Sequence, residues 1–283
     1  MDLWIIYIII YAILNGLYRS TKKLATTKEN NIYEVLAYIT LISLILVIPI
    51  SKDIFSINIY SLLIILVKAI IVAITWLLGI YSISNLDLSL YGILTLSRII
   101  FTTTLSIIIL DEVLTLNTII GILLVITGLY LTNKTTSLNI NKKLSKKALA
   151  ATFLFCLFGS ISAIIEKRLL LNITSSHLQF WTLFFITIIY FIILFIKQRK
   201  INHQAIYKNY YLILSSIFLV VGDRFLYLAN AIPSSSVIIM TLIKQLSAIV
   251  TIILGKIIFK EKNIIKRLLC SILIIIGIII ILI

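Results

Sequence analysis

Apolar runs of membrane-spanning length recur along the whole chain, and short polar segments separate them. A helix that crosses a bilayer needs about 20 mostly apolar residues. The runs are continuous and do not alternate between apolar and polar positions, which favours helices over strands. We therefore predict ten transmembrane helices, at residues 3–18, 33–50, 60–82, 88–110, 116–132, 147–166, 176–196, 209–231, 234–256 and 264–283.

The composition supports an all-α membrane protein. Hydrophobic residues make up 61% and charged residues 12% of the 283 positions, whereas about a quarter of a soluble domain is charged. The first run begins directly after Asp2, without a basic region or a cleavage site, so we expect it to remain in the mature protein. Cys156 and Cys270 lie in apolar runs without metal-binding spacing, and we expect them to be core residues.

The two halves of the chain carry the same pattern. The longest polar segment follows the fifth predicted helix, so each half holds five, and an odd number makes the second copy cross the membrane in the opposite direction. We predict two inverted five-helix repeats, residues 1–133 and 147–283, joined by a basic loop at 134–146. Shifts of 146 and then 149 residues pair Tyr81 with Tyr227, Arg98 with Lys244, Glu112 with Glu261, and Gly128 with Gly277.

A motif at the end of each half indicates a family. Residues 110–116 read Leu-Asp-Glu-Val-Leu-Thr-Leu and lead into a run with two glycines at 120–128, and 259–262 lead similarly to 276–277. This pattern resembles the end of the repeat in EamA-type transporters of the drug/metabolite transporter superfamily. The resemblance covers nearly the whole chain. It implies a transporter whose fifth and tenth helices form a packing scaffold while the other eight surround a site.

Lys and Arg residues concentrate on one side of the predicted helices. Eighteen of the 25 lie in the loops after the first, fifth, seventh and ninth helices, and three lie on the opposite side. The positive-inside rule places the rich side in the cytoplasm and both termini outside, in a multi-pass protein of the cytoplasmic membrane. The net charge of +15 is then a belt facing lipid head groups and does not require nucleic-acid binding.

Arg98 and Lys244 are each the eleventh residue of a predicted span. Helical rise puts them about 15 Å from either interface. Insertion of such a residue costs roughly 2.5 to 3.5 kcal/mol, so each needs a partner or a wet cavity. One hypothesis is that they bind an anionic part of the substrate, Arg98 as a bidentate fork and Lys244 as a point charge. The alternative is that one or both pair with Asp223.

Further polar and aromatic residues are candidates for the same substrate site. Asp223 and Arg224 are adjacent on the eighth predicted helix, about 100° apart, so each needs its own surroundings. Asp223 either neutralises a cation of the empty cavity or takes a proton, or forms a fixed interhelical salt bridge. Gln245 follows Lys244 and offers an amide. Three aromatic residues could line the cavity or simply pack or anchor at the interface: Trp76, Tyr81 and Tyr227.

Other notable positions have structural interpretations. Lys68 lies nine residues into its span, where its flexible stem can reach an interface, which favours a structural role. Glu112 and Glu261 immediately precede the fifth and tenth predicted helices, where acids complement the helix dipole. Gly121 and Gly128 lie on one face of the fifth helix and suit close helix packing or a homodimer contact.

Enzyme and cofactor motifs do not occur in the sequence: it has no GxSxG, phosphate loop or HExxH, and only two histidines. Four bases and a single acid, Asp223, lie deep within the predicted spans, and this balance favours an anionic substrate. We predict a secondary active transporter that moves a small polar, anionic metabolite by alternating access, driven by a gradient or by exchange. The alternatives are a flippase for a phosphate-linked lipid or sugar and, in another class, a non-transporting membrane interaction protein.

The orientation can be tested with a reporter that is active only in the cytoplasm. Fused after Ile283 it should be inactive, because the charge bias puts the C-terminus outside. The same reporter inserted in the 134–146 loop is the matched control and should be active. An active C-terminal fusion would show that the orientation is reversed.

Overall fold

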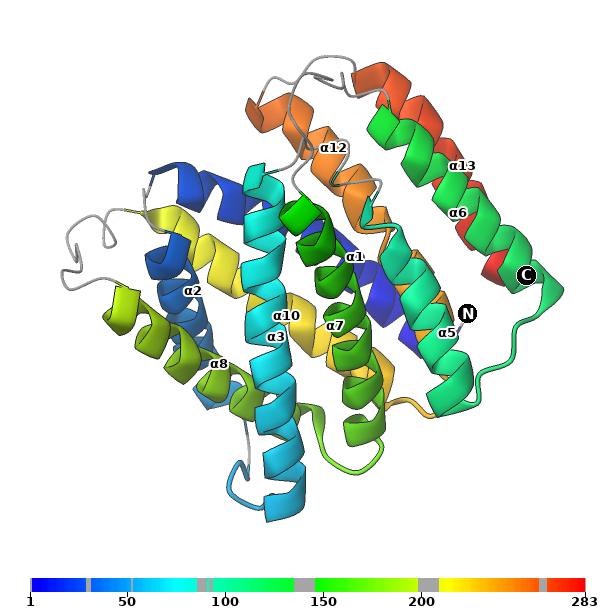
Figure 1. The fold of residues 1–283 in the computed structure, drawn as a ribbon. Helices are drawn as coiled ribbons and strands as arrows, with labels where there is room; N and C mark the ends of the chain where they lie inside the picture. The colour runs from blue at the N-terminus through cyan, green and yellow to red at the C-terminus, as the bar shows by residue number, and fades with distance from the viewer. Residues whose placement is uncertain are drawn as a thin grey trace. The chain divides into compact units, whose positions relative to one another are not determined.

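The structure is a computed structural model that describes residues 2–28, 32–51, 53–85, 91, 94–134, 146–197, 209–259 and 264–282. Within these ranges every regular element is a helix (Figure 1). The elements are α1 (Leu3–Lys28), α2 (Ile32–Val47), the 3₁₀ turn η1 (Ile48–Ile50), α3 (Ile59–Asn85), α5 (Ser97–Leu110), α6 (Leu116–Lys134), α7 (Lys146–Leu170), α8 (Ser175–Lys197), α10 (Tyr210–Ala231), α11 (Val237–Ile243), α12 (Leu246–Phe259) and α13 (Ile264–Leu282).

Ten apolar helical segments of the described chain correspond in position to the ten predicted spans. Seven are long and apolar enough to cross a membrane, and three shorter apolar helices accompany them. The chain is therefore a multi-pass α-helical membrane protein. The seven are Leu3–Thr26, Ile32–Ile50, Ile59–Ser82, Lys146–Leu170, Ser175–Lys197, Tyr210–Ala231 and Val237–Gly255; the shorter three are Ser97–Leu110, Leu116–Leu131 and Leu268–Leu282.

Two helices continue at least four residues beyond their predicted C-terminal ends. α1 continues to Lys28 instead of residue 18, and α7 continues to Leu170 instead of residue 166. Lys and Arg are good helix formers, so a helix need not end where the apolar run ends. Basic residues assigned to loops therefore lie on helices: Arg19, Lys22 and Lys23 on α1, and Lys167 and Arg168 on α7.

Contacts divide the chain into two units, each built from parts of both halves. Unit 1 is Met1–Ala73 with Glu166–Pro233, and unit 2 is Ile74–Ile165 with Ser234–Ile283. In unit 1, α1 packs along α10, and α2 packs on α8 and α10. In unit 2, α6 packs along α13, α5 against α11, and α12 against α13.

Polar side chains tie the helices of unit 1 together. Lipid tails are as apolar as leucine, so hydrogen bonds between helices add specificity that apolar packing alone lacks. Each of three side chains donates across a helix pair: Ser215 to the Thr21 hydroxyl at 3.0 Å, Ser216 to the Ile39 carbonyl at 3.0 Å, and Gln179 to the Val220 carbonyl at 2.7 Å.

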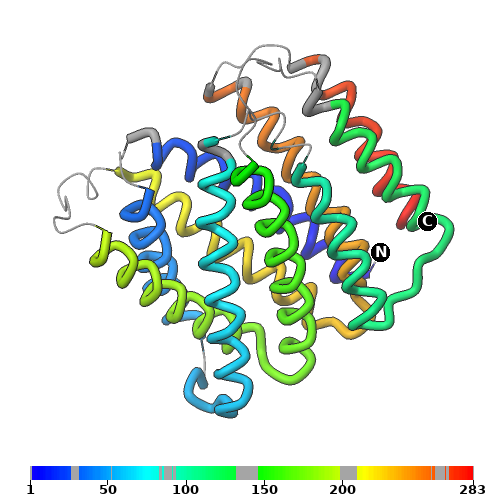
Figure 2. The backbone as a smooth tube through the Cα atoms, viewed as in Figure 1, coloured from blue at the N-terminus to red at the C-terminus, as the bar shows by residue number. Residues whose placement is uncertain are grey.

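Glycines form a close seam between α6 and α13 in unit 2. Gly121 contacts Ile281 and Gly277, whereas Gly128 contacts Ile274, so the two helices run antiparallel. Figures 1 and 2 both show these helices side by side. They correspond to the fifth and tenth predicted helices, and the close packing expected of Gly121 and Gly128 occurs within one molecule.

Replacing Gly277 by alanine should destabilise the seam. A Cβ atom there would lie 2.9 Å from the Gly121 carbonyl oxygen, and backbone cannot move aside as a flexible side chain can. We expect a loss of about 1–3 kcal/mol, seen as a lower Tm of the purified protein in detergent. Gly222→Ala on α10 is the control, because its Cβ would meet Leu14 at an ordinary 3.5 Å. Equal Tm values for the two variants would contradict the close approach.

Candidate functional site

The ninth predicted helix is interrupted at one of the two predicted midplane bases. α11 ends at Ile243, Lys244 and Gln245 form a turn, and α12 begins at Leu246. The Gln245 amide donates to the Leu242 carbonyl at 3.0 Å, a tighter pattern than the α-helical one. This leaves the Thr241 carbonyl without its usual amide. The Gln245 side chain fills that role, since its Nε2 donates to the Thr241 oxygen at 3.0 Å.

A similar interruption precedes the other base. Thr95 and Leu96 form a turn before α5 begins at Ser97. The Arg98 amide donates to the Thr95 carbonyl at 3.1 Å, and the Ser97 hydroxyl donates to the Leu94 carbonyl at 2.8 Å. Arg98 is therefore the second residue of a helix that starts anew. A single unbroken helix was predicted for 88–110 and for 234–256, and the turns correct both predictions.

The Arg98 side chain rests on a glycine of α7. Its Nη2 donates to the Gly159 carbonyl at 3.3 Å, and its Cζ lies 6.0 Å from the centre of the Phe155 ring. A Cβ at position 159 would come within 2.9 Å of that Cζ, so any larger residue would push the guanidinium out of this position. One helical turn further, the hydroxyls of Thr102 and Ser160 lie 2.8 Å apart and hold α5 to α7.

The remaining predicted site residues divide between the two units. Lys244, Gln245 and Trp76 are half-buried in unit 2, where Tyr81 is 42% exposed. In unit 1, Asp223 and Arg224 are half-buried on α10, and Arg224 Nη1 donates to the Ser176 hydroxyl on α8 at 2.9 Å. Tyr227 of the same helix is buried, with Lys68 Nζ 5.4 Å from its ring centre.

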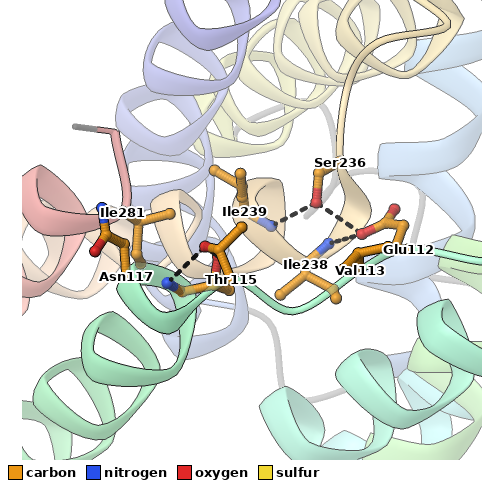
Figure 3. Close-up of a pocket in the computed structure, with 9 residues that line it drawn as sticks. Glu112, Val113, Thr115, Asn117, Ser236, Ile238, Ile239 and Ile281 are labelled. Carbon is orange, nitrogen blue, oxygen red and sulfur yellow. Dashed lines mark hydrogen bonds between the residues drawn. The ribbon is translucent and has the colours of Figure 1, made fainter.

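Glu112 caps a helix, although not the one that follows it. Its Oε1 accepts from the Val237 amide at 2.6 Å. Its Oε2 accepts from the Ile238 amide at 3.1 Å and from the Ser236 hydroxyl at 2.7 Å (Figure 3). These are the first groups of α11. The expectation that Glu112 complements the dipole of the fifth helix, α6, is thus corrected, while Glu261 lies outside the described residues.

The turn between α5 and α6 brings Glu112 to this position. Asp111 adopts the left-handed conformation with φ 55°, which Asp tolerates better than most residues, and so ends α5. The α6 start has its own cap, because the Thr118 amide donates to the Thr115 hydroxyl at 3.2 Å. The carboxylate of Glu112, Thr115 and Asn117 line a pocket of about 340 Å³ together with Ile238 (Figure 3).

Comparison with known proteins decides the family. The model of the EamA-like transporter family matches residues 2–134 and again 146–283, which together span nearly the whole chain. The chain belongs to the EamA-like transporter family. It is a membrane transporter of the drug/metabolite transporter superfamily, as the resemblance in the sequence predicted. No curated protein sequence matches it.

A solved structure shares the EamA-like fold of this chain. It superposes with a TM-score of 0.74 at 12% identity, covering 96% of this chain and 94% of the other. Its title reads only "Crystal structure of protein". At this identity the likeness shows the fold alone, so the chemistry of the EamA-like site has to come from its own residues.

A buried ion pair of this EamA-like chain was missed by the sequence prediction. Lys68 Nζ lies 3.4 Å from Glu166 Oε2, and the exposed fractions of the two side chains are 2% and 9%. From the sequence, Asp223 was expected to be the single acid deep inside a span, and Lys68 was expected to reach an interface. Both statements are corrected. Glu166 was the last residue of the predicted span 147–166, where an acid is expected at the interface.

Loss of the Glu112 carboxylate charge should loosen the start of α11. Glu112→Gln replaces charge-assisted bonds to two amides with one neutral acceptor, and we expect a cost of about 1–3 kcal/mol, measured as a lower Tm in detergent. Asp111→Asn is the matched control: it removes an adjacent, exposed acid, and Asn tolerates the left-handed conformation. A Tm for Glu112→Gln no lower than that of Asp111→Asn would contradict the capping role.

Proposed function

We propose that this EamA-like protein is a secondary active transporter that moves a small polar, anionic metabolite across the cytoplasmic membrane by alternating access. The observation that carries the proposal is that Arg98 and Lys244, related by the internal repeat, both lie at interruptions of the fourth helix of a repeat. Both belong to unit 2, in which α5 packs against α11.

A basic side chain beside an interrupted helix is suited to binding an anion. Discontinuous helices in transporters point their positive N-terminal ends at anionic groups, and Arg98 stands at the N-terminal end of α5. A guanidinium has five N–H donors, and the Gly159 carbonyl accepts from one of its nitrogens. Among the described residues of unit 2, no carboxylate forms an ion pair with Arg98. A substrate phosphate or carboxylate would supply that partner.

The other candidates take supporting roles in this proposal. Gln245 is already committed to the Thr241 carbonyl through its Nε2, so its amide oxygen is the group left to orient a substrate donor. We assign Trp76 and Tyr81 to the wall of the site in unit 2. Asp223, Arg224 and Tyr227 belong to unit 1 and are proposed as substrate-binding candidates within that unit.

We further propose the inverted-repeat arrangement as the basis of alternating access. The antiparallel packing of α6 and α13, the last helices of the two family matches, supports opposite orientations of the repeats. In this arrangement the repeats are residues 1–133 and 147–283, joined by the basic loop 134–146. The loop lies in the cytoplasm and both termini lie outside, as the charge bias requires.

Uptake into liposomes tests the anion site. Purified protein is assayed against a panel of labelled phosphorylated, carboxylated and amine solutes, and we expect an anionic class to be accepted. Arg98→Gln and Lys244→Gln should each lower kcat/KM about tenfold or more, because each removes a charge-assisted hydrogen bond.

Arg168→Gln is the control, because it removes an exposed base near the end of α7 and should leave uptake unchanged. Unchanged uptake in both the Arg98 and the Lys244 variant would remove the anion site. Acceptance of amines alone would remove the anionic substrate class.

A further inference from the structure

Unit 1 contains a buried polar cluster of Lys68, Glu166, Lys167 and Asn230, here called the Glu166 cluster. Both carboxylate oxygens of Glu166 are engaged: Oε2 lies 3.4 Å from Lys68 Nζ, and Oε1 accepts from Asn230 Nδ2 at 2.8 Å. Lys167 Nζ donates to the Asn230 carbonyl at 3.1 Å and to the Ile232 carbonyl at 2.7 Å. The cluster thus joins α3, α7 and the end of α10.

Burial of the charged groups in the Glu166 cluster costs free energy unless each group has a partner. Measured over whole residues, backbone included, the four are 2 to 7% exposed. A charge removed from water needs several partners to remain ionised. A buried ion pair often contributes no more to stability than apolar residues of the same size would. Removing one partner, in contrast, is costly, because it leaves the other charge buried alone. The cluster therefore fixes the relative positions of three helices more than it adds to their stability.

The position of the cluster in the chain indicates what it fixes. The chain passes between the two units three times: after Ala73, after Ile165 and after Pro233. Lys68 lies five residues before the first passage, and Glu166 and Lys167 are the first two residues after the second. Asn230 and Ile232 immediately precede the third. All three connections between the units are therefore cross-linked, within unit 1, by one set of side chains.

We propose that Glu166 is a positioning residue for transport, which holds the three passages between the units in register through Lys68 and Asn230. A displacement at one passage is then transmitted to the other two. Lys167 completes the arrangement, because its charge caps the C-terminal carbonyls of α10 directly before Pro233. The role in the transport cycle rests on the proposed function, whereas the linkage of the three passages does not.

Hydrogen exchange of the full-length protein in detergent tests the linkage without a substrate. Glu166→Gln keeps the shape of the side chain, places an amide donor among donors and leaves Lys68 uncompensated. We expect amide exchange about tenfold or more faster around residues 73–74, 165–166 and 233–234 together. Faster exchange confined to the neighbourhood of residue 166 would overturn the linkage.

Glu34→Gln is the matched control. Glu34 is also a carboxylate of unit 1, 4% exposed in the first turn of α2, and α2 does not pass between the units. The Glu34→Gln variant should leave amide exchange at the three passages at the wild-type rate. If both variants speed exchange equally at the passages, the effect is general destabilisation and the proposal fails.

An exchanged pair keeps the test valid if the single variant does not fold. Lys68→Glu combined with Glu166→Lys restores opposite charges at the same two positions, and it should return exchange at the first two passages to near the wild-type rate. Exchange at the third passage should stay fast, because a lysine at position 166 cannot accept from Asn230 Nδ2. Exchange at the first two passages of the double variant as fast as in Lys68→Glu alone would overturn the proposal.

Uptake of the accepted solute in liposomes then separates the two levels of the inference. Glu166→Gln should lower kcat with little change in KM, because the residue does not touch substrate. The exchanged pair regains the ion pair but not the Asn230 hydrogen bond, so it should recover part of the lost kcat. Coupled exchange at the passages with unaltered kcat would keep the linkage and remove its role in transport. A substrate site that fails the Arg98 test leaves the exchange result unaffected.

Discussion

Inside a bilayer no water is present to bond a polar group, so each such group must find its partner within the protein. This constraint explains the otherwise scattered contacts of the chain. The Ser215 hydroxyl and the Gln179 amide donate hydrogen bonds to neighbouring helices. The Gln245 side chain donates to a carbonyl that a turn leaves without its backbone amide, and Glu112 accepts from the first amides of α11. In each case a side chain does what water does in a soluble protein.

The same constraint makes the interruptions of the fourth helices informative. A turn at Lys244 and Gln245 gives up regular backbone bonds, which is costly in hydrocarbon and tolerated where protein or a wet cavity surrounds the backbone. Arg98 stands beside the corresponding turn. Two bases thus lie at two breaks in helices that the internal repeat relates.

The sequence predicted the spans well because membrane thickness sets their length, and it predicted the family because motifs at both repeat ends matched. It did not predict the turns, since neither Thr95-Leu96 nor Lys244-Gln245 contains the Gly or Pro that usually signals one. Glu112 was assigned to the nearest helix along the chain, although its partners lie some 124 residues away.

Glu166 was missed for a different reason. The apolar run ends beside it, although Lys167 and Arg168 allow α7 to continue to Leu170. The partners of the buried Glu166, which are Lys68 and Asn230, lie far along the chain, and no local pattern displays them. Of the candidate site, the sequence singled out the bases Arg98 and Lys244 from their depth alone, and their role in binding stays a prediction. The glycine on which Arg98 rests lies 61 positions later, and only three-dimensional contact connects the two.

The seam between α6 and α13 has a consequence for how such a chain arises. Gly121 and Gly277 bring bare backbone from the last helix of one copy against the last helix of the other. Neither copy alone can cover that strip, because its partner is encoded in the opposite half of the gene. Two half-length polypeptides made separately would therefore each expose one of two complementary helix surfaces. Fusion of the two coding regions would convert an intermolecular helix contact into an intramolecular one.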